Sequence, residues 1–211
     1  MMVLSSGVAR APGQAGYISG GSYEPGTKCS PPAGYPKQSS TCSYIDFASG
    51  INDPAALEVE IRVPTNAKSF SFDFNFYTWE YPGWICSQYN DFYVTLMWPQ
   101  VPGLPDANIS FDSLGNPVSV NNGMLEVCSA GYAGGKYFTC PFGTAELSGT
   151  GFEGHAATGW LRTKAPAQPG STIKIRFAIW DQGDEALDST VLIDNFVWDT
   201  ESSEVGTGRP L

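Results

Sequence analysis

The sequence predicts an all-β protein, a two-sheet sandwich of jelly-roll type with long disulfide-pinned loops. Several segments alternate apolar and polar residues with a period of two, which is typical of strands with one buried face. The 24 glycines and 16 prolines are spread along the whole chain, as expected where many short strands are joined by turns. The five cysteines lie in or beside Gly-, Pro- and Ser-rich stretches, where disulfides can hold irregular chain in place.

The predicted strands follow one another with turn-rich connections and no helical pattern between them. The clearest alternation lies in 70–76, where phenylalanine occupies every second position, and residues 1–6 resemble the end of a strand. Residues 11–43 and 129–156 are expected to be long loops. The predicted strands span residues 57–63, 70–76, 92–98, 108–111, 124–127, 158–163, 173–180 and 189–198.

The length and composition fit one domain. Sandwiches of 211 residues commonly fold as a single unit, and 42% hydrophobic with 13% aromatic residues supply a core. We therefore expect 1–211 to be a single β-sandwich domain, and a fragment of a longer surface protein.

The cysteine spacing predicts two local disulfides. Cys29 with Cys42, and Cys128 with Cys140, would each close a loop of about a dozen residues, for which about 3 kcal/mol of stabilisation is expected. Cys86 would then be the unpaired thiol, and five reduced thiols are the alternative. A zinc site is not expected, because no cysteines have metal-finger spacing and the chain has one histidine.

The charge restricts the partners and, with the cysteines, predicts the location. A net charge of −10 repels nucleic acid and anionic membranes, and no apolar run is long enough to insert into a membrane. Disulfides form in oxidising compartments. The chain is therefore expected to be secreted or displayed at the cell surface.

Acidic side chains follow the core-facing rows of several predicted strands. Asp181 continues the apolar row of 173–179, and Glu80 continues the row of 70–76 if the chain stays extended. Asn90 precedes the row of 92–98 with Asp91 beside it, and Asp194 shares a face with apolar residues of 189–198.

Buried carboxylates require a compensating cation or a proton. No Lys or Arg is near Glu80 in the sequence, and a hard divalent ion such as calcium takes carboxylate and amide oxygens. The alternative is that these groups accept hydrogen bonds from loop backbone. The loop 181–189 adds further oxygen donors, although its spacing is not that of an EF-hand. The candidate calcium ligands are Glu80, Asn90, Asp91, Asp181, Asp184, Asp188 and Asp194.

Two segments resemble the bacterial choice-of-anchor L domain family. The run 74–92 contains an aromatic strand, Glu80-Tyr81-Pro82 and Asn90-Asp91-Phe92, and 175–196 contains Trp180-Asp181, Gly183-Asp184 and Asp188-Ser189. The resemblance implies a secreted or surface β domain with no established catalytic activity. Its motif positions are Glu80, Asn90, Asp91, Asp181, Asp184 and Asp188, and Trp79 stands where the family usually has a second acid.

The expected function is that of a calcium-binding, non-catalytic module for adhesion or surface display, whose partner is a surface glycan or another protein. A carbohydrate-binding module using exposed aromatic residues is the alternative, with Trp180 on the polar face of its strand. An enzyme is not expected, although Glu80 and Asp91 could in principle form a glycosidase pair. The partner-binding residues are not identified. The aromatic candidates are Trp79, Tyr81, Trp84, Tyr89, Trp160 and Trp180.

Overall fold

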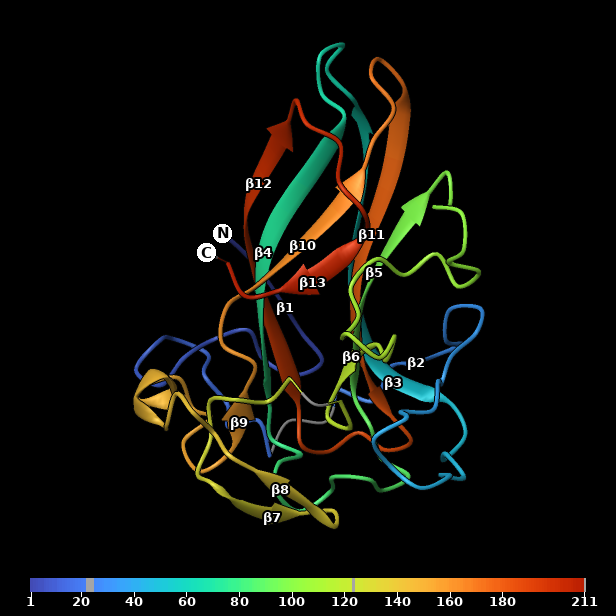
Figure 1. The fold of residues 1–211 in the computed structure, drawn as a ribbon. Coiled ribbons are helices and arrows are strands. Elements are labelled where there is room, and N and C mark those ends of the chain that lie inside the picture. Colours follow the sequence, from blue (N-terminus) through green and yellow to red (C-terminus); the bar gives the residue numbers. More distant parts are fainter. Residues whose placement is uncertain (22–24, 123, 211) are drawn as a thin grey trace.

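The computed structural model describes residues 1–21, 25–122 and 124–210. Two antiparallel sheets pack face to face as a sandwich (Figure 1). The predicted sandwich class is therefore confirmed, whereas the jelly-roll type is not. Residues 22–24, within the predicted loop 11–43, lie outside the described ranges.

The first sheet has the strand order β1-β12-β4-β10-β13, with β9 pairing with β4. Its central pair, β4 and β12, joins the phenylalanine-rich strand to the last long strand. The bounds are β1 (Met2–Ser5), β4 (Ser69–Thr78), β9 (Ala156–Ala157), β10 (Leu161–Pro166), β12 (Ser189–Asp199) and β13 (Gly206–Gly208).

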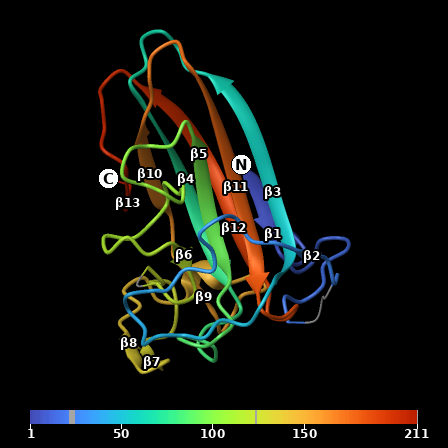
Figure 2. The same cartoon turned by 90° about the vertical axis from the view of Figure 1, so that its right-hand side faces the viewer.

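The second sheet has the order β2-β3-β11-β5-β6, and its outer face is turned toward the viewer in Figure 2. The bounds are β2 (Lys28–Cys29), β3 (Ile51–Arg62), β5 (Phe92–Trp98), β6 (Val118–Ser119) and β11 (Thr172–Gln182). A separate hairpin pairs β7 (Gly131–Ala133) with β8 (Lys136–Phe138), and a short 3-10 helix, η1, spans Ala145–Leu147. The long loops gather at one end of the sandwich (Figure 1).

The core lies between the two sheets and is built on the phenylalanine row of β4. Phe72 and Phe74 are fully buried. The ring centroid of Phe72 lies 5.2 Å from that of Phe177, and that of Phe74 lies 5.0 Å from that of Tyr93, so both contacts cross from one sheet to the other. These cross-sheet aromatic contacts confirm that the alternation of 70–76 marks an inner face.

Strand β5 turns odd-numbered residues toward the main core, whereas the sequence predicts that its even-numbered residues lie there. Tyr93 and Met97 point into the main core, while Phe92, Val94 and Leu96 join a second apolar cluster on the outer face of the sheet. The prediction that the even-numbered row of 92–98 faces the core is therefore wrong. Both faces of β5 are buried, so period-two alternation carries no signal there.

Two predicted strands are reduced to isolated pairings. Residues 108–111 contribute single bridges, Leu96 with Asn108 and Phe111 with Pro117, and 124–127 contributes Val127 with Ala157. Asn108 explains part of this, since its side-chain oxygen accepts from the backbone N–H of Thr95 and of Ser110. A side chain thus takes the place of ladder bonds.

One predicted disulfide forms and the other does not. Cys128 is bonded to Cys140, as the spacing predicts, and Cys42 is bonded to Cys86 across 44 residues. The predicted Cys29–Cys42 bond is wrong, because Cys29 is exposed and unpaired in β2. Folding brings the Cα atoms of Cys42 and Cys86 within 5.5 Å, a separation that a disulfide spans.

Candidate functional site

Five carboxylate side chains meet at the loop-rich end of the sandwich, and we call them the acidic cluster. Strand pairing explains the convergence, because Thr78 at the end of β4 pairs with Ser189 at the start of β12. Trp180 near the end of β11 pairs with Phe92 at the start of β5. Both sheets and the β11–β12 connection therefore supply members, which interact electrostatically and are Glu80, Asp91, Asp181, Asp184 and Asp188.

The cluster is largely inaccessible to solvent. Glu80 and Asp91 are each 1% exposed and Asp181 is 0% exposed. Asp91 accepts hydrogen bonds from the Ser189 hydroxyl (2.6 Å) and from the backbone N–H of Gln182 (3.3 Å). These two bonds join the start of β5 to both ends of the β11–β12 connection.

Other oxygens of the cluster are poorly satisfied. The Oε2 atom of Glu80 and both carboxylate oxygens of Asp181 are buried and receive no hydrogen bond of normal geometry from the described residues. In the same ranges, no Lys or Arg forms an ion pair with Glu80, Asp91 or Asp181. Buried anionic oxygens without such partners are costly.

Burial and mutual repulsion raise the pKa of three carboxyl groups. Burial, followed by the negative charges of Asp91 and Asp184, raises the pKa of Glu80 to about 10. Burial raises the pKa of Asp91 to about 7 against the opposing effect of its hydrogen bonds from Ser189 and Gln182. The pKa of Asp181 rises well above its ordinary value through burial and then the charge of Asp91. Without a positive counter-charge, part of the cluster therefore retains its protons at neutral pH.

Two predicted ligands lie apart from this arrangement. The side chain of Asp194 is 52% exposed and its carboxylate lies 3.2 Å from the backbone nitrogen of Met1, so the prediction that it faces the core is wrong. The core-facing residues before it are Val191 and Ile193, and a bulge between Asp194 and Val197, with φ of 54° at Asn195, then brings Trp198 to the core side, so Asp194 and Trp198 do not share a face. Asn90 is fully buried, but its side-chain oxygen accepts from the backbone N–H of Asn121 and thereby holds the 119–122 loop.

Sequence reasoning missed residues that support the cluster. Ser189 donates to Asp91, and its position directly after Asp188 in the hairpin was the available signal. Gly7 packs so closely that a Cβ atom there would lie 1.8 Å from Oδ2 of Asp188. No local pattern indicates this contact, because 181 residues of chain separate the pair.

The side chains are not arranged as a ready-made metal site. Among the residues that the structure describes, no group of three or more His, Cys, Asp or Glu side chains could hold a metal ion as placed. The unsatisfied oxygens of Glu80 and Asp181 are nevertheless of the kind that calcium prefers. A cation would fit only if the carboxylates turned toward a shared point.

Several of the aromatic candidates for sugar binding are buried or lie edge-on to one another. Trp180 is 1% exposed and Tyr81 is 3% exposed, so the prediction that Trp180 is exposed on the polar face of its strand is wrong. Trp84 is exposed, but it meets Tyr89 edge-on at an interplanar angle of 89°. These rings therefore offer no flat surface to a sugar.

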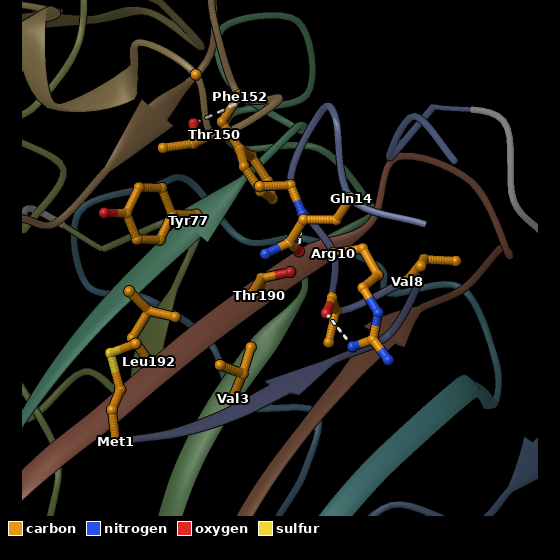
Figure 3. Close-up of a pocket in the computed structure, with 13 residues that line it drawn as sticks. Met1, Val3, Val8, Arg10, Gln14, Tyr77, Thr150, Phe152, Thr190 and Leu192 are labelled. Carbon is orange, nitrogen blue, oxygen red and sulfur yellow. Dashed lines mark hydrogen bonds between the residues drawn. The ribbon is translucent and has the colours of Figure 1, made fainter. Parts of the chain in front are cut away.

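A separate apolar groove lies on the outer face of the first sheet (Figure 3). It has a volume of about 260 Å³, and Tyr77 and Phe152 form part of its wall with ring centroids 5.4 Å apart. The guanidinium of Arg10 at its edge donates to the backbone oxygen of the neighbouring Ala9 (3.0 Å). The described residues that line this groove include no carboxylate side chain.

Comparison with known proteins identifies the domain type. Residues 2–196 match the family described as Choice-of-anchor L domain. No curated protein and no solved structure matched the chain. Within the described ranges, no helix is long and apolar enough to cross a membrane.

Proposed function

The chain belongs to the choice-of-anchor L domain family, and from this we propose a secreted or cell-surface module for adhesion or display that is stabilised by a calcium ion at the acidic cluster. The family and the two disulfides support an extracellular location. The observation that carries the calcium proposal is the burial of Glu80, Asp91 and Asp181 without a cationic side chain.

Calcium suits this cluster because of its charge and its flexible coordination. It takes about six to eight oxygens in variable geometry, so carboxylates that are not yet aligned can turn toward it together with backbone carbonyls. When bound, the ion supplies the positive charge that protons otherwise supply. Glu80 and Asp181 are the first candidates to hold it, because Oε2 of Glu80 and both carboxylate oxygens of Asp181 are buried and receive no hydrogen bond of normal geometry from the described residues.

The ligand positions would then connect the two sheets. Glu80 follows β4 of the first sheet, while Asp91 precedes β5 and Asp181 lies in β11 of the second sheet. An ion held by all three would cross-link the loop-rich end of the sandwich. It would stabilise the folded state by mass action, by about 2.7 kcal/mol at a hundredfold excess over its dissociation constant.

The same burial supports a non-catalytic role. A glycosidase pair must reach the bond that it cleaves. Glu80 and Asp91 are each 1% exposed and thus face the interior rather than a substrate cleft.

The test combines elemental analysis of the purified protein with melting curves in calcium and in chelator. Calcium should raise the melting temperature of the wild-type protein, and Asp181→Asn should reduce that increase. Asp194→Asn is the matched control, because Asp194 lies outside the cluster with its side chain 52% exposed. It should respond to calcium as the wild type does.

Equal melting temperatures with and without calcium in the wild-type protein would remove the metal from this proposal. An effect of Asp194→Asn as large as that of Asp181→Asn would place the ion elsewhere. Neither result would alter the family assignment.

A further inference from the structure

A second groove, on the outer face of the second sheet, has the features of a ligand site, and we call it the second-sheet groove. Its volume is about 440 Å³, within the range of small-molecule sites. It lies on the face seen in Figure 2, over β3, β11 and β5. None of the acidic-cluster residues lines it.

Small residues from two neighbouring strands line the middle of the groove. Ala178 of β11 pairs with Ala56 of β3, and both line the groove. Loop residues outside the strands complete the lining, among them Pro31, Pro32 and Pro105. Small side chains flanked by rigid prolines give a preformed hollow, which reduces the entropy lost on binding.

The groove contains an arginine with no ion pair. Arg176 is exposed in β11, next to the alanine floor, and it forms no ion pair within the described part of the chain. Glu58 lies opposite Arg176 in the strand register, but its carboxylate pairs with Lys174 (3.1 Å). Asp106, an acidic residue that also lines the groove, forms an ion pair with Lys37, whose Nζ lies 2.8 Å from its Oδ2. The guanidinium is therefore available to an anion from outside.

A buried tryptophan forms part of the lining of the groove. Trp180, which lines the groove, is 1% exposed, and its indole N–H has no hydrogen-bond acceptor among the described residues. Its ring is held in place by Phe92, stacked at a centroid distance of 5.5 Å. The side chain therefore gives the groove a rigid apolar lining, while its buried N–H lies out of reach of a ligand.

We propose that the second-sheet groove binds an acidic sugar, a uronic acid unit of an oligosaccharide. Arg176 would hold the carboxylate, since a guanidinium binds this group through two parallel hydrogen bonds. Trp98, partly buried at the same edge, offers an aromatic surface to the C–H face of the ring, and Gln100 adds amide hydrogen-bonding groups. Charge favours an anion at Arg176, although the whole chain has a net charge of −10.

Cys29 can report whether a ligand occupies the groove. Cys29 lines the groove and is exposed, and it is the one cysteine outside the two disulfides. A ligand in the groove should slow its alkylation by a thiol reagent. The reporter needs no added label.

The experiment measures Cys29 alkylation and calorimetric binding with short oligomers of glucuronic acid and of glucose of equal length. The acidic oligomer should bind and protect Cys29, and the neutral one should bind about tenfold more weakly or not at all. Arg176→Gln should weaken binding of the acidic oligomer about tenfold. Arg62→Gln, in β3 of the same sheet but outside the groove, is the matched control and should bind normally.

Several outcomes would overturn the proposal. These are equal binding of the neutral oligomer, undiminished binding by Arg176→Gln, or equal affinity for an oligoglutamate peptide, which would show general anion binding. Glu80→Gln should leave sugar binding unchanged, so failure of the calcium proposal and failure of this one can be distinguished. Arg176 is exposed, and unchanged melting of its variant would confirm that the fold is intact.

Discussion

Raising the pH in the presence of a chelator should destabilise this protein, because the folded state holds protons that the unfolded chain has lost. Glu80 changes its pKa from an ordinary 4.5 to about 10 on folding. Below the lower value both states are protonated, and between the two values only the folded state keeps the proton. Stability therefore falls as pH rises through this window.

The size of the effect follows from the width of the pH interval. Each pH unit inside the window costs about 1.4 kcal/mol for one group, so a rise from about pH 5 to about pH 8 should cost about 4 kcal/mol through Glu80. For a domain of this size, that lowers the melting temperature by about 10 °C. Calcium should remove most of the dependence, since the ion would replace the proton.

The variant that isolates this effect is Glu80→Gln. Glutamine has nearly the same shape and cannot ionise, so melting temperature in chelator should change less with pH than in the wild type, and calcium should stabilise less. Glu58→Gln is the control, because Glu58 is an exposed residue of β3 that pairs with Lys174. Its pH profile should follow the wild type.

A wild-type melting temperature in chelator that stays constant or rises from about pH 5 to about pH 8 would refute the linkage argument. If the melting temperature falls with rising pH and calcium does not restore it, the argument from buried protons stands and the calcium proposal is wrong. The two results are separable in one set of melting curves.

Three further results are expected. Thiol titration of the denatured, unreduced protein should find one free sulfhydryl, and Cys29→Ser should remove it; a remaining thiol would contradict the Cys42–Cys86 bond. Gly7→Ala should lower stability by about 2 kcal/mol in chemical denaturation, because the added Cβ would lie 1.8 Å from an Asp188 oxygen; unchanged stability would show that this contact yields easily. The Arg162 guanidinium lowers the pKa of Asp73 through hydrogen bonds of 2.6 and 2.8 Å, so the pair stabilises the fold above the ordinary Asp pKa and this contribution is lost as pH falls through the lowered value. Asp73→Asn should therefore cost about 1 kcal/mol or less at neutral pH and less in acid, and an equal cost at both would contradict the ion-pair explanation.

The sequence by itself determined the features that depend on local alternation. The phenylalanine row of β4 and the odd-numbered row of β11 face the core as predicted, because side chains alternate between faces with each residue. Where such rows end at the same end of the sheets, the next acids converge, and Glu80 and Asp181 accordingly meet in the acidic cluster. Motifs of two short segments also sufficed to indicate the family.

The tertiary structure decided what depends on an inserted residue or on distant chain. The bulge at Asn195 reversed every face that follows it, so Trp198 packs against the core while Asp194, which precedes the bulge, lies on the opposite face from Val191 and Ile193. Cys42 bonds to Cys86 rather than to Cys29, because chain folding and not spacing sets which sulfur atoms meet. The second-sheet groove likewise depends on Ala56 and Ala178 becoming neighbours through strand pairing, a contact between residues far apart in sequence that no local period encodes.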